Sequence, residues 1–176
     1  MGTVWYFAYG SNLQAATLRG RRGIDVLRSV PVRAPGWRLV FDKPGLIHPN
    51  AAVANIVPED GAHVIGVAYE ITADDHAHVE LTEGVMIGSY RRVEVAVEPL
   101  DASVNAPPAT ALSLSSDKRA PGRLPSHRYL GLVVEGALEH GLPDDWVASL
   151  RAVVSREETD EERALRSVID EALKRR

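Results

Sequence analysis

The chain has 176 residues, of which 45% are hydrophobic and 25% charged, with a formal net charge of -4 and no cysteine. These values are typical of one globular domain, so we expect a single domain over residues 1–176. The acidic balance argues against nucleic acid and anionic membranes as partners, and the lack of cysteine excludes disulfides and a catalytic thiol. The sequence shows neither a signal-peptide pattern nor an apolar stretch of membrane-spanning length, which predicts a cytoplasmic location.

The first predicted strand covers residues 4–9 and ends abruptly at Gly10, Ser11 and Asn12. A strand that runs into such a turn presents several backbone N–H groups and two small polar side chains at one point. This arrangement suits a carboxylate or an oxyanion. The same residue types are also ordinary turn formers, so a plain strand-to-turn junction is the alternative.

Four arginines follow this turn, at positions 19, 21, 22 and 28. They could form an anion-binding patch. A run of charges is more often a solvated face, and we favour that interpretation for all four.

The middle of the chain reads mainly as strands. Residues 37–41 form one predicted strand, and residues 51–57 and 64–71 form two more. The Pro-Glu-Asp-Gly sequence at 58–61 is a strong turn signal, so we expect the last two strands to form a hairpin.

A helix is predicted over residues 73–83, with Thr72 or Asp74 as its N-cap and Gly84 at its end. Two further strands follow at residues 89–97, with Val93, Val95 and Val97 facing inward, and at 110–114. Residues 115–126 form a polar loop, either a lid over a pocket or a surface loop.

The last third of the chain is helical. We expect helices over residues 127–140, from about residue 143, and over 159–173. The last helix begins with the capping-box pattern of Thr159 and Glu162. Its apolar face contains Leu165, Val168, Ile169 and Leu173. Strands dominate the first two thirds and helices the last third, so the fold class is α+β.

The histidines give no metal-binding pattern. Only His76 and His78 are close in sequence, and a spacing of two places them on different faces of a helix. Ser11 lacks the Gly-x-Ser-x-Gly frame of a nucleophilic serine, and no dinucleotide or P-loop fingerprint is present. We therefore expect neither a metal nor a cofactor.

One carboxylate is a candidate for proton transfer. Glu83 lies at the end of the helix predicted over 73–83, where the helix dipole favours its neutral form. In a pocket this carboxyl could transfer protons. An exposed glutamate at a helix end is the simpler alternative.

Several motifs occur together in one order. They are Tyr-Phe-Ala-Tyr-Gly-Ser-Asn-Leu at 6–13, Glu-Gly-Val at 83–85 with Tyr90, Pro-Ser-His-Arg-Tyr at 125–129 and Gly-Leu-Pro at 141–143. In this respect the chain resembles the gamma-glutamylcyclotransferase family from Tyr6 to about Val153. The resemblance implies a small mixed β-barrel with flanking helices and a C-terminal amphipathic helix, of which residues 157–176 lie outside the resemblance.

The resemblance also implies an activity. The substrate's α-amine attacks its own γ-glutamyl carbonyl, which releases 5-oxoproline and a free amine or amino acid. Glu83 is the implied general acid and base, and no cofactor or metal takes part. The implied substrate-binding residues are Tyr6, Phe7, Ala8, Tyr9, Gly10, Ser11, Asn12, Leu13, Tyr90 and Tyr129.

Alternatives stay open on three points. An amidase or acyltransferase acting on a γ-glutamyl-tagged metabolite, or a non-catalytic small-ligand binding module, could share these motifs. The predicted strand 110–114 lacks the aromatic residue that the family usually has there, so the leaving amine is undetermined. The helix 159–173 packs either on the barrel or on a second copy in a homodimer.

Overall fold

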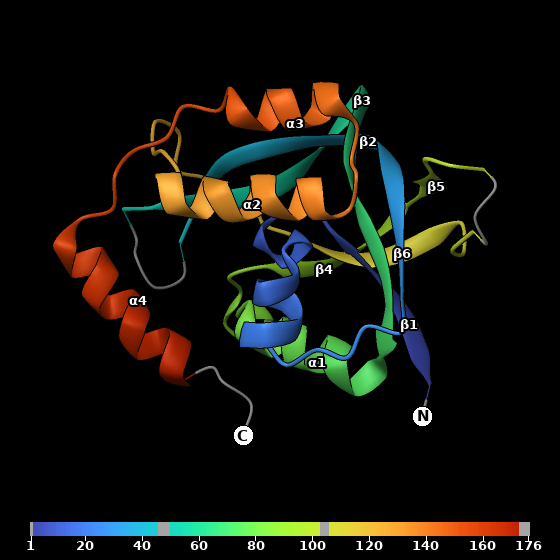
Figure 1. The fold of residues 1–176 in the computed structure, drawn as a ribbon, viewed down its shortest axis with the longest axis horizontal. Helices are drawn as coiled ribbons and strands as arrows, with labels where there is room; N and C mark the ends of the chain where they lie inside the picture. Colours follow the sequence, from blue (N-terminus) through green and yellow to red (C-terminus); the bar gives the residue numbers. More distant parts are fainter. Residues whose placement is uncertain (1, 46–49, 103–105, 173–176) are drawn as a thin grey trace.

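The computed structural model describes residues 2–45, 50–102 and 106–172, and Figure 1 shows its strands and helices. The strands are β1 (Thr3–Ala8), β2 (Arg28–Pro44), β3 (Ala52–Thr72), β4 (Arg91–Ala96), β5 (Glu98–Pro99) and β6 (Thr110–Ser115). The α-helices are α1 (Ala73–Thr82), α2 (His127–Glu139), α3 (Asp144–Arg151) and α4 (Asp160–Ala172), with shorter helical turns at Ser11–Leu13, Ala16–Arg21 and Val85–Ile87. The predicted α+β class is confirmed.

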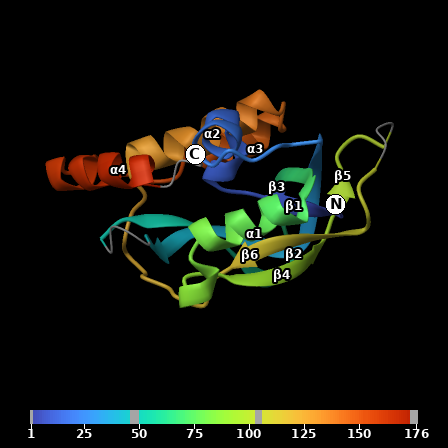
Figure 2. The same cartoon turned by 90° about the horizontal axis from the view of Figure 1, so that it is seen from below.

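The strands form one curled mixed sheet in the order β4-β6-β1-β3-β2-β5. β1 runs parallel to β6 and antiparallel to β3, so it occupies the centre of the sheet. Figure 2 shows α2, α3 and α4 gathered on one side of the strands. A mixed sheet with flanking helices is therefore confirmed as well.

The hairpin predicted around residues 58–61 is wrong. Residues 52–72 form one long strand, β3, which pairs with β2 from Pro44↔Ala52 to Arg28↔Glu70. The register shifts between Pro35 and Trp37, and both Gly36 and Gly61 have positive φ angles, of 79° and 78°. Glycine adopts such angles without strain, so the local turn sequence produces a bend in a two-stranded ribbon and not a chain reversal.

The predicted helix signals are confirmed. The Thr72 hydroxyl accepts a hydrogen bond from the Asp75 N–H at 3.0 Å and caps α1. Thr159 and Glu162 form a complete capping box, with reciprocal bonds of 3.2 and 2.7 Å at the start of α4. On the predicted apolar face of α4, Leu165 and Val168 are exposed. Leu173 and the side chain of Ile169 lie outside the described part.

The core has two halves on opposite faces of the sheet. One joins the sheet to the helices and includes Tyr6, Ala8, Leu13 and Val133. The other is built from residues of the strands and their ends, among them Phe7, Tyr9, Val95 and Val97. Side chains therefore alternate along β1 as a strand requires, and the inward placement predicted for Val95 and Val97 is confirmed.

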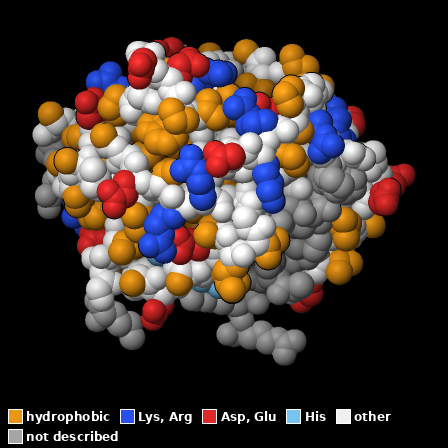
Figure 3. Space-filling model, turned by 180° about the vertical axis from the view of Figure 1, so that it is seen from behind, with side chains coloured by type: hydrophobic (Ala, Val, Ile, Leu, Met, Phe, Trp, Pro, Cys, Tyr) orange, Lys and Arg blue, Asp and Glu red, His pale blue; other side chains and the backbone are white. Residues whose placement is uncertain are grey.

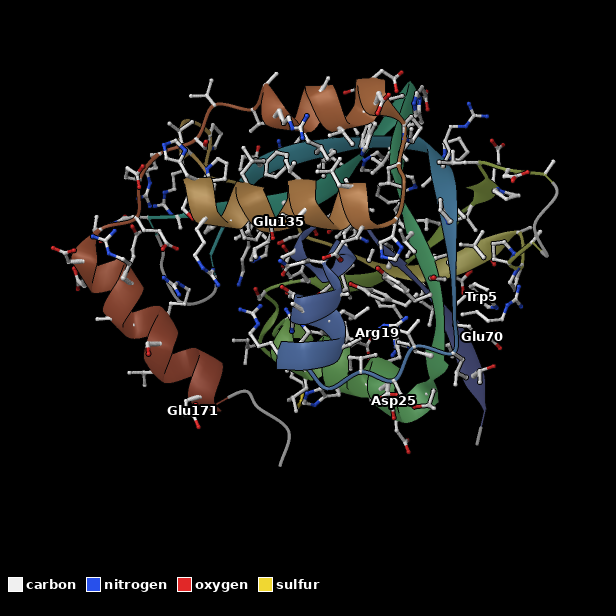
Figure 4. All side chains as sticks on the ribbon, viewed as in Figure 1. Trp5, Arg19, Asp25, Glu70, Glu135 and Glu171 are labelled. Carbon is white, nitrogen blue, oxygen red and sulfur yellow. The ribbon has the colours of Figure 1, made fainter. Side chains whose placement is uncertain are left out.

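The surface carries intermixed charges. On the face seen in Figure 3, cationic and anionic side chains lie among hydrophobic ones. On β1, Trp5 lies opposite Glu70 of β3 (Figure 4). The Arg28 guanidinium lies 5.0 Å from the centroid of the Trp5 ring. Within the described ranges, no helix combines the length and apolar character needed to cross a membrane.

Candidate active site

A cavity of about 220 Å³ opens where β1 ends. The turn after β1, the end of α1, the start of β3 and the start of α2 all contribute to its wall. Of the site residues predicted from the sequence, those that line it are Tyr6, Tyr9, Gly10, Ser11, Asn12, Glu83, Tyr90 and Tyr129. The fold thus brings together residues that are more than a hundred positions apart, and their chemical roles stay predictions.

Three predicted contacts do not line this cavity. The Phe7 side chain is fully buried in the strand-built half of the core, and Ala8 and Leu13 are buried in the half beneath the helices. Strand alternation turns Phe7 away from Tyr6, and Leu13 anchors the turn to the core. These residues pack in the core behind the cavity wall.

Glu83 is held at the cavity wall by two donors. It is the C-cap of α1, and Gly84 then takes a left-handed conformation with φ of 72°. The Asn12 side-chain amide donates to Glu83 Oε1 at 3.2 Å, and Arg22 Nη2 donates to the same oxygen at 2.5 Å. The Glu83 side chain is 19% exposed, so the carboxylate is fixed by the protein and still open to the cavity.

Arg22 was not expected here. Its residue is only 6% exposed, and its guanidinium donates to Asn12 Oδ1 at 2.8 Å, to Thr82 Oγ1 and to Glu83. The interpretation of the arginines as a solvated face is therefore wrong for Arg22. The charge-assisted hydrogen bond from this guanidinium fixes the position of the Glu83 carboxylate.

The turn after β1 presents backbone N–H groups at the cavity wall. The N–H groups of Leu13 and Gln14 donate to the carbonyls of Gly10 and Ser11. The Ser11 N–H faces the Tyr129 hydroxyl, and within the described residues the Asn12 N–H is not a donor in the backbone bonds of the loops and turns. Backbone donors next to a cavity can receive an oxyanion.

Tyr129 closes the cavity on the other side of this turn. Ser126 caps α2 by accepting a hydrogen bond from the Tyr129 N–H at 3.1 Å, which fixes the start of the helix. The Tyr129 hydroxyl accepts a hydrogen bond from the Ala54 N–H at 3.0 Å. A Cβ atom on Gly10 would lie 3.2 Å from this hydroxyl, so the absence of a side chain there lets α2 approach closely.

The cavity tyrosines remain neutral. Burial raises the pKa of Tyr129 to about 12, and it raises the pKa of Tyr6, Tyr9 and Tyr90 further above the usual value. Tyr9 and Tyr90 donate to the carbonyls of Leu114 and Ala54, both at 2.6 Å. They form a rigid aromatic wall without charge.

Lys43 is a second residue that the sequence analysis missed. It lines the cavity near the end of β2, and the residue is 1% exposed. Lysine is usually exposed, and the neighbouring Pro44 and Gly45 are typical of a loop. Nothing in the sequence therefore indicated that Lys43 is buried.

The outer rim of the cavity is strongly charged. It contains cationic and anionic side chains from the residues after β1, from α2, from the segment before α4 and from α4 itself: Arg21, Arg128, Glu158, Glu162 and Arg166. Arg166 pairs with Glu158 at 3.0 Å, and Glu162 pairs with Arg156. Among the described residues, no three histidine or acidic side chains are arranged to hold a metal ion.

Residues 63–150 match the model of the AIG2-like family. The chain belongs to this family. A gamma-glutamyl cyclotransferase of Aspergillus oryzae is 32% identical over 165 residues, which cover 84% of this chain and 60% of that protein. A gamma-glutamylcyclotransferase of Bos taurus is 28% identical, over 84% of this chain and 77% of the relative. The resemblance inferred from the sequence motifs is thus confirmed for this AIG2-like chain.

A solved structure shares the fold. A protein titled gamma-glutamyl cyclotransferase superposes with a TM-score of 0.78 at 23% identity, covering 97% of this chain and 99% of the other. The AIG2-like chain spans about three fifths of the length of the two fungal relatives it matches first.

Proposed function

We propose that this protein is a gamma-glutamyl cyclotransferase. It converts a γ-glutamyl amino acid or γ-glutamyl amine into 5-oxoproline and the free amino acid or amine. One observation carries this proposal: the Glu83 carboxylate faces the same cavity as the turn at residues 10–12 and is joined to it through Asn12. The names of the similar proteins support the same reaction.

The reaction needs a proton acceptor and a proton donor in sequence. Glu83 takes a proton from the substrate's α-ammonium, and the freed amine attacks the γ-carbonyl carbon. Formation of the new C–N bond moves the carbonyl electrons onto oxygen, and backbone N–H groups of the turn at residues 10–12 receive this oxyanion. The carbonyl re-forms as the original C–N bond breaks, and Glu83 returns the first proton to the leaving nitrogen. It then takes the second proton from the attacking nitrogen, which leaves the lactam N–H, and passes that proton to the released amine.

The shape of the cavity also contributes to the reaction. The nucleophile belongs to the substrate, so the protein must fold a flexible γ-glutamyl chain into a five-membered geometry. The buried tyrosines offer rigid walls for that purpose. Asn12 and Arg22 fix the position of the carboxylate before the substrate arrives, which avoids reorganisation during proton transfer.

Product identity tests the proposal. Purified protein is incubated with γ-glutamyl amino acids and γ-glutamyl amines, and 5-oxoproline and glutamate are quantified separately. We expect 5-oxoproline in a one-to-one ratio with the released amine. Glutamate in its place would identify an amidase, and ligand binding without any product would identify a binding module.

The proposal includes three further expectations from the sequence. The protein acts on a small molecule in the cytoplasm, it needs no nucleic acid or membrane, and it can form a homodimer. Size measurement in solution checks the last of these.

A further inference from the structure

Lys43 places a buried ammonium group in the cavity. Its Nζ donates to Ser89 Oγ and to the Pro44 carbonyl, both at 2.9 Å. The same nitrogen lies 4.2 Å from the centroid of the Tyr90 ring. These three contacts fix the ammonium against one wall of the cavity.

The hydrogen-bond partners of Lys43 among the described residues are neutral. An ammonium has three N–H donors, and these two bonds use two of them. A buried charge without a counter-ion is costly, so proteins normally pair it. The other inner cation, Arg22, is already paired with Glu83. Among the described residues, Lys43 therefore offers the cavity a positive charge that an anion can neutralise.

We infer that Lys43 is a specificity-determining residue that binds a carboxylate of the substrate. The inference rests on the proposed function, since a γ-glutamyl substrate supplies such a group. A γ-glutamyl amino acid has two carboxylates, one on the glutamyl unit and one on the departing amino acid. A γ-glutamyl amine has only the first.

The charge state of Lys43 agrees with this role. Burial lowers its pKa to about 8, while the Glu83 carboxylate opposes that shift. The ammonium form therefore predominates at neutral pH, where it can attract an anion.

Binding of unreactive analogues tests the inference without relying on catalysis. N-glutaryl-L-alanine has both carboxylates but lacks the amine, so it cannot cyclise. N-butyryl-L-alanine lacks the glutamyl-side carboxylate, and N-glutaryl-L-alaninamide lacks the other. Calorimetry measures the affinity of all three for the parent protein, for Lys43→Met and for Lys43→Arg. Lys118→Met, which changes an exposed lysine of the neighbouring loop, is the matched control.

We expect Lys43→Met to weaken binding of N-glutaryl-L-alanine by about 10- to 100-fold, the range for a hydrogen bond to a charged group. The analogue that lacks the carboxylate bound by Lys43 should bind the parent and Lys43→Met equally, which identifies that carboxylate. Lys43→Arg should restore part of the affinity, and Lys118→Met should match the parent.

Three results would overturn the inference. They are parent-like binding by Lys43→Met, an equal loss for all three analogues, and no binding of any analogue to the parent. Lys43→Gln replaces Lys43→Met if the latter does not fold. If the analogues are discriminated but no 5-oxoproline forms from γ-glutamyl substrates, the proposed function fails and the role of Lys43 stands.

Discussion

Arg22 Nη2 lies 2.5 Å from Glu83 Oε1, although 61 positions separate the two residues in the chain. Arg22 follows the helical turn at Ala16–Arg21, and Glu83 ends α1. Asn12 joins the pair, because it accepts a hydrogen bond from Arg22 and donates one to Glu83. Three separate elements therefore converge on one carboxylate, and the contact between Arg22 and Glu83 determines its position.

Removing Arg22 should destabilise the protein. In Arg22→Met, the partly buried Glu83 carboxylate and the side chains of Asn12 and Thr82 lose a donor. We expect the free energy of unfolding to fall by about 2–3 kcal/mol in urea titration. The matched control is Arg92→Met, because the half-exposed Arg92 pairs with Glu80 and such pairs contribute at most about 1 kcal/mol. An equal cost for the two variants would show that the buried pair has no special structural role.

The docking of α2 onto the turn after β1 should depend on Gly136. A Cβ atom there would lie 2.4 Å from the backbone of Leu13 and Gln14. We expect Gly136→Ala to lower the free energy of unfolding by about 2 kcal/mol or more, because backbone must move. Gly131, on the same helix, has nothing within 4 Å of its Cβ position, so Gly131→Ala should be neutral or slightly stabilising. Equal thermal midpoints for the two variants would contradict this packing.

The sequence predicted local structure better than long-range pairing. The caps at Thr72 and Thr159 and the ends at Gly84 and Gly141 depend on neighbouring residues alone, and the structure has all of them. The turn signal at residues 58–61 was misleading because β3 pairs with β2, earlier in the chain, on both sides of this segment. Pairing of that kind depends on tertiary contacts that no local window contains.

The same limit applies to the site. Glu83 and Tyr129 were found through motifs, whereas Arg22 and Lys43 were missed. Both are long cations in segments that read as surface, and both are buried through partners contributed by other segments. The composition around Arg22 and Lys43 does not indicate those partners. The resemblance also included Phe7 among the substrate contacts, although strand alternation turns its side chain away from the cavity.

Binding of carboxylates should weaken at alkaline pH. The pKa of Lys43 is about 8, so its ammonium is lost as the pH rises through that value. The Glu83 carboxylate favours the ammonium, Lys118 disfavours it, and the Tyr90 phenol stays neutral in this range. The affinity for N-glutaryl-L-alanine should therefore be constant from pH 6 to about 7 and fall above pH 8.

Calorimetry across this pH range checks the titration of Lys43. In Lys43→Arg the fall should disappear, because a guanidinium keeps its charge throughout. An unchanged fall in that variant would assign the titration to another group.

The Glu83→Gln variant tests the central claim most directly. The amide is nearly isosteric and still accepts the hydrogen bonds from Asn12 and Arg22, so the variant should fold, with a thermal midpoint below that of the parent because the buried Arg22 loses its counter-ion. It cannot take a proton from the substrate's ammonium. We expect kcat for 5-oxoproline release to fall by about 10²–10⁴-fold with little change in KM.

Glu80→Gln is the internal comparison, since Glu80 lies one turn earlier on α1 and pairs with Arg92. Steady-state 5-oxoproline release is measured for the parent and both variants under one set of conditions. The account predicts a large loss of kcat for Glu83→Gln and near-parent turnover for Glu80→Gln. Near-parent 5-oxoproline release by Glu83→Gln would contradict it.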